Sequence, residues 1–149
     1  MQPTEENSPR ASKPWEADYY HCRLRRWATF ETGLRGLLTL LVQEQGRFLV
    51  ISNRSGKRYI QFAVEKDGAI FAEAVSNSFL AGPERLSETD CGKLLELSWE
   101  NPGKRTPNFW RQVPPPVPIG DLASLGVRTL RDVLCVPTPT QLDIRRGVF

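Results

Sequence analysis

The sequence of 149 residues has few of the side chains that catalytic and metal sites use, since it contains one histidine and three cysteines. The cysteines, Cys22, Cys91 and Cys135, are odd in number and widely spaced, which argues against a disulfide framework. Zinc needs three or four nitrogen or sulfur ligands, and these residues show no recognisable ligand spacing. No Gly-rich loop has the pattern of a nucleotide site. We therefore expect neither a metal nor a cofactor.

Long apolar runs are also missing, because no stretch approaches the ~20 residues that cross a bilayer. The first fourteen residues lack an apolar segment and a basic start, so the sequence predicts no secretory signal and a cytoplasmic location. This stretch is polar, contains three prolines and cannot offset the entropy of ordering. We expect residues 1–20 to be a disordered tail and residues 21–149 to form a single α+β domain.

A strong excess of one charge sign is absent as well, since the net charge is +3 and acidic residues are interspersed almost throughout. Basic residues gather at 23–26, 104–105 and 145–146, but no run reaches five like charges. A mildly basic, solvated surface is the simpler interpretation. A nucleic-acid-associated regulatory protein that uses these scattered basic patches remains the alternative hypothesis.

Three short runs rich in β-branched and aromatic residues are present in the first half of the chain. The runs 47–52, 58–64 and 69–75 are separated by Ser55-Gly56 and Asp67-Gly68, which supply the positive φ that tight hairpins need. They predict a three-stranded antiparallel meander. Its strands offer apolar and amide surface rather than acids, bases or nucleophiles, so they favour binding over catalysis.

Three other segments have helical signals. Apolar residues follow one helical face from Trp27 to Val42, and Gly46 suits the C-terminal cap of that helix. Ser87 and Asp90 resemble a capping box that opens a second, short helix, and Asp121 is predicted to cap a third. The buried stripe of the third helix is expected to contain Leu122, Leu125, Leu130, Val133 and Leu134.

Together these elements predict an α+β fold in which an antiparallel sheet of three or more strands packs with a long N-terminal helix and two C-terminal helices. The proline-rich residues 100–120 are expected to form an extended connector, and residues 141–149 a last extended piece. Side-chain alternation makes both faces of the sheet apolar, and helices cover one of them. The C-terminal helix, a dimer partner or a bound peptide would cover the other face.

Two positions are candidates for chemistry. His21 lies beside Cys22, and a His-Cys pair can form a reactive thiolate, although adjacent residues rarely face each other. Glu73 lies between alanines in a predicted strand, where we expect it to point outward and to pair with a basic residue such as Arg58. We therefore predict no catalytic residue. Trp110, among prolines, is expected either to pin a loop to the core or to line a binding groove.

Several short motifs occur in an order that is typical of one family. They are "RYIQFA" at 58–63, "AEAVSNSFL" at 72–80, "LLELSWENP" at 94–102, "NFWR" at 108–111 and "VRTLRDVL" at 127–134. With these motifs the chain resembles the TY-Chap N-terminal domain family, which is grouped with type III secretion chaperones and YbjN-like proteins. The resemblance covers about residues 27–136. It implies a secretion-chaperone-like α+β fold, a peptide-binding or protein-binding role, and a small bacterial protein.

We therefore predict a non-enzymatic, chaperone-like module that holds a partner segment on an apolar face or edge of its sheet. The client is a protein or peptide that the sequence does not identify, and neither a membrane nor nucleic acid is the expected partner. Homodimerisation is the expected self-association, since the uncovered face could meet its own copy. The predicted peptide-binding residues are Tyr59, Gln61, Phe71, Val75, Phe79 and Trp110.

Overall fold

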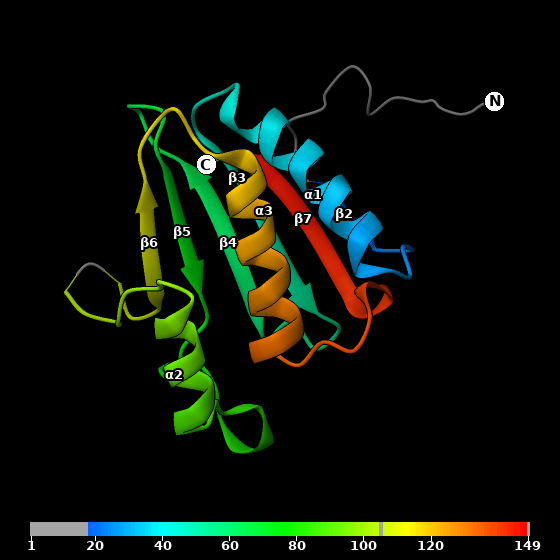
Figure 1. Ribbon diagram of the computed structural model, residues 1–149, viewed down its shortest axis with the longest axis vertical. Coiled ribbons are helices and arrows are strands. Elements are labelled where there is room, and N and C mark those ends of the chain that lie inside the picture. Colours follow the sequence, from blue (N-terminus) through cyan, green and yellow to red (C-terminus); the bar gives the residue numbers. More distant parts are fainter. Residues whose placement is uncertain (1–17, 105, 149) are drawn as a thin grey trace.

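The computed structural model describes residues 18–104 and 106–148, and within them the chain forms one sheet and three α-helices (Figure 1). The strands are Asp18–His21 (β2), Arg47–Asn53 (β3), Tyr59–Val64 (β4), Ile70–Ala74 (β5), Phe109–Val113 (β6) and Leu142–Val148 (β7). The helices are Trp27–Val42 (α1), Glu88–Glu96 (α2) and Ile119–Arg128 (α3), and α3 continues into a π-helical turn, Thr129–Val133 (η3). Two short 3₁₀ turns are Gly82–Glu84 (η2) and Pro139–Gln141 (η4).

All neighbouring strands are antiparallel, and their order in the sheet is β2-β7-β3-β4-β5-β6. The predicted meander is confirmed as its centre, because β3 pairs with β4 and β4 with β5. Gly56 and Gly68 in the two turns have φ values of 76° and 88°, which only glycine adopts without strain. The predicted last extended piece is β7, which lies between β2 and β3 and pairs with both.

Strand β2 corrects the predicted boundary of the tail. Asp18, Tyr19 and Tyr20 pair with β7 and so belong to the sheet. Their partners lie more than a hundred residues further along the chain, at Ile144 to Arg146, and local composition carries no sign of such a pairing. The rest of the predicted tail, residues 1–17, lies outside the described residues.

The capping residues predicted for α2 and α3 can be compared with the observed starts of these helices. α2 begins as predicted, because the Ser87 hydroxyl accepts from the backbone N–H of Asp90 and the Asp90 carboxylate accepts from the N–H of Ser87. For α3 the prediction of Asp121 as the cap is wrong, since the N-cap is Pro118, whose carbonyl accepts from the Leu122 N–H at 3.0 Å. Asp121 instead lies in the first turn, where a negative charge favours the helix dipole.

The predicted connector at 100–120 is partly a strand. Its residues Phe109–Val113 form β6, which pairs with β5 at the end of the sheet. On the other side of β6, Glu100 and Trp110 exchange two backbone hydrogen bonds of 2.8 and 3.2 Å. Prolines follow directly at 114–116, and since proline has no N–H to donate, the ladder stops there.

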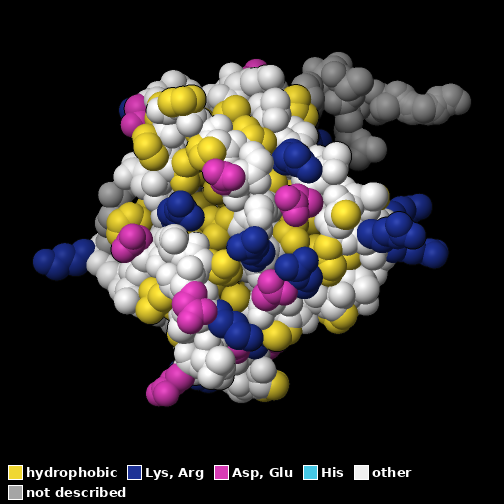
Figure 2. Space-filling model, in the orientation of Figure 1, with side chains coloured by type: hydrophobic (Ala, Val, Ile, Leu, Met, Phe, Trp, Pro, Cys, Tyr) yellow, Lys and Arg dark blue, Asp and Glu magenta, His cyan; other side chains and the backbone are white. Residues whose placement is uncertain are grey.

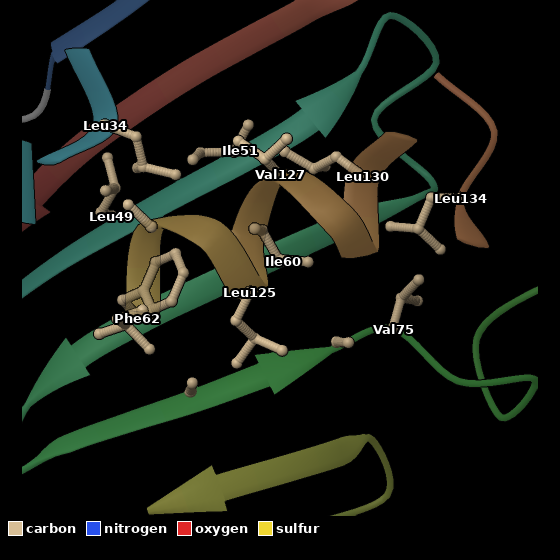
Figure 3. Packing of buried hydrophobic residues seen from close by; sticks show 14 of the residues in the cluster. Leu34, Leu49, Ile51, Ile60, Phe62, Val75, Leu125, Val127, Leu130 and Leu134 are labelled. Atoms are coloured by element: carbon tan, nitrogen blue, oxygen red, sulfur yellow. The ribbon is translucent and has the colours of Figure 1, made fainter. Parts of the chain in front are cut away.

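Helices α1 and α3 lie side by side on one face of the sheet and enclose the core (Figures 1 and 3). The predicted stripe of α3 and η3 is confirmed, because Leu122, Leu125, Leu130, Val133 and Leu134 are all buried. They meet a layer of fully buried strand residues, each of which stabilises the fold by roughly 1.5–3 kcal/mol through burial. The sheet contributes Leu49, Ile51, Ile60, Phe62 and Ile70 to this layer.

Gly126 allows the close approach of α3 to its neighbours. A Cβ at this position would lie 3.0 Å from Leu34 Cδ2 and 3.4 Å from Ile60 Cδ1, in a core without room for it. We expect Gly126→Val to destabilise the protein by about 1–3 kcal/mol, because overpacking forces side chains out of their rotamers. The matched control is Gly36→Val on α1, where nothing lies within 4 Å and the change should stay within about 0.5 kcal/mol. Urea unfolding measures both, and equal effects would refute the close approach.

No helix among the described residues covers the opposite face of the sheet, which we call the outer face. α1 contacts α3, β3 and β4, while α2 contacts η3, so all three helices belong to the other side or to one end of the sheet (Figure 1). The prediction left open whether the C-terminal helix covers the second face, and α3 does not. Figure 2 shows the helix-covered side, where charges of both signs are interspersed among hydrophobic side chains.

Candidate functional site

One row of side chains crosses the outer face through all six strands. The pairing register aligns Tyr19 with Arg145, Arg145 with Val50, Val50 with Gln61, Gln61 with Glu73, and Glu73 with Trp110. Side chains alternate between faces along a strand, so this row points away from α1 and α3. Val50, Gln61, Glu73 and Trp110 are half-buried, whereas Tyr19 and Arg145 are exposed.

The outer face is hollowed by two adjoining open depressions that share part of this row. The polar depression has a volume of about 600 Å³ and lies over β2, β7, β3 and β4. The apolar depression has a volume of about 480 Å³ and lies over β3, β4 and β5. Val50, Gln61 and Arg145 line both. The polar depression is further lined by Tyr19, Ser52, Arg54, Ser55, Gly56, Tyr59 and Asp143, and the apolar one by Phe48, Phe62, Ala63, Val64, Glu65, Phe71 and Glu73.

Asp143 anchors one wall of the polar depression. Its side chain is only 5% exposed, and its two oxygens accept from different donors. Oδ2 accepts from the Tyr19 hydroxyl at 3.1 Å, and Oδ1 is bonded to Nδ1 of His21. This hydrogen bond to Asp143 is the main reason why the pKa of Tyr19 is raised, while the charges of Arg54 and Arg145 act in the opposite direction.

The apolar depression has an aromatic rim. Phe71 stacks on Trp110 with ring centroids 6.1 Å apart and an angle of 19° between the planes. At the opposite side, the Arg145 guanidinium carbon lies 5.9 Å from the centroid of the Phe48 ring, within the range of a cation–π contact. Val50 and Ala63 line the depression between these groups. The surface is thus an aliphatic floor between two aromatic groups, which suits apolar side chains of a ligand.

Glu73 is held by neutral donors and not by Arg58, so the predicted ion pair is wrong. The Glu73 carboxylate accepts from Gln61 at 2.9 Å, from Thr106 at 2.8 Å and from Asn108 at 3.1 Å. Arg58 instead forms an ion pair with Glu84, because it lies at the end of β4 that adjoins η2. The prediction that Glu73 points outward agrees with its place in the outer row.

The structure brings four of the six predicted binding residues together on the outer face. Tyr59 and Gln61 line the polar depression, Phe71 lines the apolar depression, and Trp110 stacks against Phe71. Trp110 lines neither depression itself, and its indole N–H donates to the carbonyl of Asn101 at 3.0 Å, which ties the loop before β6 to this strand.

The other two predicted residues, Val75 and Phe79, lie outside both depressions. Val75 is fully buried and lies in the core beside Leu134 (Figure 3). The alternation of side chains ends with β5 at Ala74, so the consecutive residues Ala74 and Val75 both turn toward the core. Phe79 is 58% exposed and follows β5 in a loop, where its N–H donates to the carbonyl of Ser76, and it lines neither depression.

Sequence reasoning missed the residues that β2 and β7 contribute. Tyr19 was assigned to the tail, and Asp143 and Arg145 to an extended piece without a partner. The available signal was the alternation in residues 142–148, where Leu142, Ile144 and Arg146 share one face, but it did not reveal the neighbouring strands. Only the pairing of β7 with β3 places Arg145 beside Val50.

The geometry separates the candidate catalytic pair. His21 binds Asp143 on the outer face, whereas Cys22, the next residue, is buried in the core on the other side. Burial raises the pKa of the Cys22 thiol, which lowers the fraction of reactive thiolate at neutral pH. His21 therefore does not activate Cys22.

The three cysteines should differ in their rates of alkylation. Cys135 is exposed, Cys91 is half-buried with a pKa raised by burial and by Asp90, and Cys22 is 6% exposed. We expect iodoacetamide to modify Cys135 first and Cys22 last, with Cys22 about tenfold slower or more at pH 8. Mass spectrometry of peptides at successive times measures the order. Fast modification of Cys22 would restore the reactive-thiolate hypothesis.

Across 18–104 and 106–148, no group of three or more His, Cys, Asp or Glu side chains is arranged to hold a metal ion. No helix in this part of the chain has both the length and the apolar character that a bilayer crossing requires.

The comparison with protein-family models gives a match over most of the chain. Residues 23–147 match TY-Chap3, described as "T3SS (YopN, CesT) and YbjN peptide-binding chaperone 3". The chain belongs to the TY-Chap3 family. This confirms the resemblance to TY-Chap proteins that the sequence motifs indicated, and the α+β fold agrees with it. The match includes α1 through most of β7, and therefore both depressions apart from Tyr19. Searches of curated proteins and of solved structures found no match.

Proposed function

We propose that this TY-Chap3 protein binds an extended segment of a client protein on the outer face of its sheet, as a chaperone-like module and not as an enzyme. The family is a peptide-binding chaperone class, which supports this type of role. The observation that carries the proposal is the outer face itself, which none of the helices of residues 18–104 and 106–148 covers. Two adjoining depressions there expose apolar, aromatic and hydrogen-bonding groups together.

The shape of this face favours an extended ligand over a compact one. Both depressions are open and lie along β3 and β4, so together they form a shallow trough that follows the strands. An extended peptide presents alternate side chains to one side, and such a trough can accept them in sequence. A second copy of the chain is the competing occupant of the outer face. The proposed function also assumes the cytoplasmic location that is expected from the sequence.

Site-specific photo-crosslinking tests this proposal. We would place p-benzoylphenylalanine at Gln61, which lines both depressions, and in a control protein at Thr39, which is exposed on α1. After irradiation in the cells that the protein comes from, mass spectrometry identifies the crosslinked segments. We expect crosslinks from position 61 to a contiguous segment of another protein, and few from position 39.

Two outcomes would contradict the proposal. Equal crosslinking from both positions, or none from position 61, would mean that the outer face binds no client. Crosslinks from position 61 to another copy of the same chain alone would replace the client by a homodimer. The family match does not support nucleic acid as the ligand. Nuclease treatment before irradiation ensures that nucleic acid does not bridge the crosslinked proteins.

A further inference from the structure

We propose that the client segment carries an acidic side chain that binds Arg145 and Arg54 in the polar depression, next to a large apolar side chain in the apolar depression. This inference rests on the proposed function and specifies the chemistry of the client. It follows from the distribution of charge along the outer face. Arg54 lies at the polar end of the trough, Arg145 lies where the two depressions meet, and Glu65 and Glu73 line the apolar depression alone.

Both arginines line the polar depression. Arg145 is exposed and lines both depressions, and among the described residues no carboxylate forms an ion pair with it. Arg54 donates from Nη2 to the carbonyl oxygen of Thr140 at 2.7 Å, and its Nε lies 3.8 Å from Asp143 Oδ1 in an ion pair, so part of its five-donor guanidinium is left for a ligand. The Ser52 hydroxyl lines the same depression and can also donate to a carboxylate, whereas the Tyr19 hydroxyl already donates to Asp143.

The carboxylates on this face are already engaged, and they divide it into two parts of opposite charge. In the polar depression, two arginines and the buried Asp143 give a net charge of +1, and Asp143 accepts from Tyr19 and His21. The apolar depression is lined by Glu65 and Glu73, and its one basic residue is Arg145, which is shared with the polar depression and is already counted there. An acidic client residue is therefore attracted to the polar depression and repelled from the apolar one.

Strand geometry sets the spacing of the two client residues. Along β3 the polar depression is lined by Ser52 and the apolar one by Phe48, four positions away, with Val50 shared between them. Four residues of a strand span about 13 Å, and side chains on one side repeat about every 6.6 Å. An extended client thus reaches both depressions when its acidic and large apolar residues are two or four positions apart.

Selection from a random dodecapeptide library displayed on phage tests the inference with the full-length protein. We expect the pool retained by the wild type to be enriched in Asp or Glu two or four positions from Phe, Tyr, Trp, Leu or Ile. Arg145→Gln should lose the acidic enrichment and keep the apolar one, because the guanidinium is exposed and the floor is unchanged. The matched control is Arg128→Gln, exposed at the end of α3 on the other side, whose pool should equal that of the wild type.

Binding of one retained peptide then measures the contact between its acidic side chain and Arg145. Replacing its glutamate with glutamine should raise the Kd about threefold to tenfold for the wild type and less than about twofold for Arg145→Gln. Fluorescence anisotropy measures the four Kd values, and circular dichroism establishes that each variant is folded. Equal losses for wild type and Arg145→Gln would overturn the inference.

The outcomes separate this inference from the proposed function. A wild-type pool rich in apolar residues without acidic enrichment, or with basic enrichment, overturns the acidic client and leaves peptide binding at the outer face intact. Retained peptides whose binding is unaffected by a change at Val50 overturn the proposed function. The absence of any retained peptide overturns both.

Discussion

Replacing Arg58 with lysine is expected to destabilise the protein by about 2–3 kcal/mol although the charge is kept. The Arg58 side chain is 11% exposed and joins three segments. Its Nε and Nη2 donate to the Glu84 carbonyl at 3.0 and 2.9 Å, and its Nη1 donates to the Leu134 carbonyl at 3.0 Å. Lysine presents a single nitrogen, which cannot reach the carbonyls of η2 and of the end of η3 together. At least one carbonyl then loses its partner in a desolvated place.

The neighbouring residue supplies the control for this experiment. Lys57 is exposed and donates from no side-chain atom to the segments that Arg58 joins, so Lys57→Ala should change the free energy of unfolding by less than about 0.5 kcal/mol. Urea denaturation followed by circular dichroism measures both variants. A loss for Arg58→Lys as small as that for Lys57→Ala would show that the carbonyl contacts contribute little.

The second large effect concerns binding: Val50→Thr is expected to raise the Kd for the client segment about tenfold. Val50 lines both depressions and lies in the middle of the outer row. The change keeps the β-branched shape and the strand preference but places a hydroxyl against the apolar part of the ligand. Burying a hydroxyl without a partner costs about 1–3 kcal/mol, and 1.4 kcal/mol corresponds to a factor of ten.

Val148→Thr is the matched control for Val50→Thr. Val148 is also a strand valine, 47% exposed near the end of β7, and it lines neither depression. Its substitution should leave the Kd unchanged. The client segment found by crosslinking, labelled with a fluorophore, serves as the ligand for anisotropy titrations of wild type and both variants. Similar Kd values for all three would place binding away from the outer face.

Local signals predicted the elements of this fold well. The helical stripe of α1, the Ser87–Asp90 capping box and the two glycine turns depend on residues close together in sequence, and each is confirmed. The sheet order was not predictable in the same way. β2 and β7 pair Tyr19 with Arg145, more than a hundred positions apart in the sequence, and short strands without a hairpin turn carry no local sign of their neighbours.

In the candidate site, too, the residues placed by local signals were predictable, and those placed by long-range strand pairing were not. Tyr59, Gln61 and Phe71 were predictable because the meander fixes their faces through alternation. Val75 was not, because the chain leaves the sheet after Ala74 and alternation no longer applies. The two arginines were visible in the sequence only as ordinary surface charges. Their grouping at the polar depression depends on strand neighbours and on a turn, which composition does not encode.

The position of β7 also has a consequence for the order in which the protein can fold during synthesis. β7 follows every other described element in the chain, yet it lies between β2 and β3. Until it leaves the ribosome, β3 has an unpaired edge and β2 has no described strand beside it, while α1 and the meander are already available. Contacts across such long sequence separations slow folding. A nascent chain of this protein thus passes through a stage with an open sheet edge, at which it is itself vulnerable to aggregation.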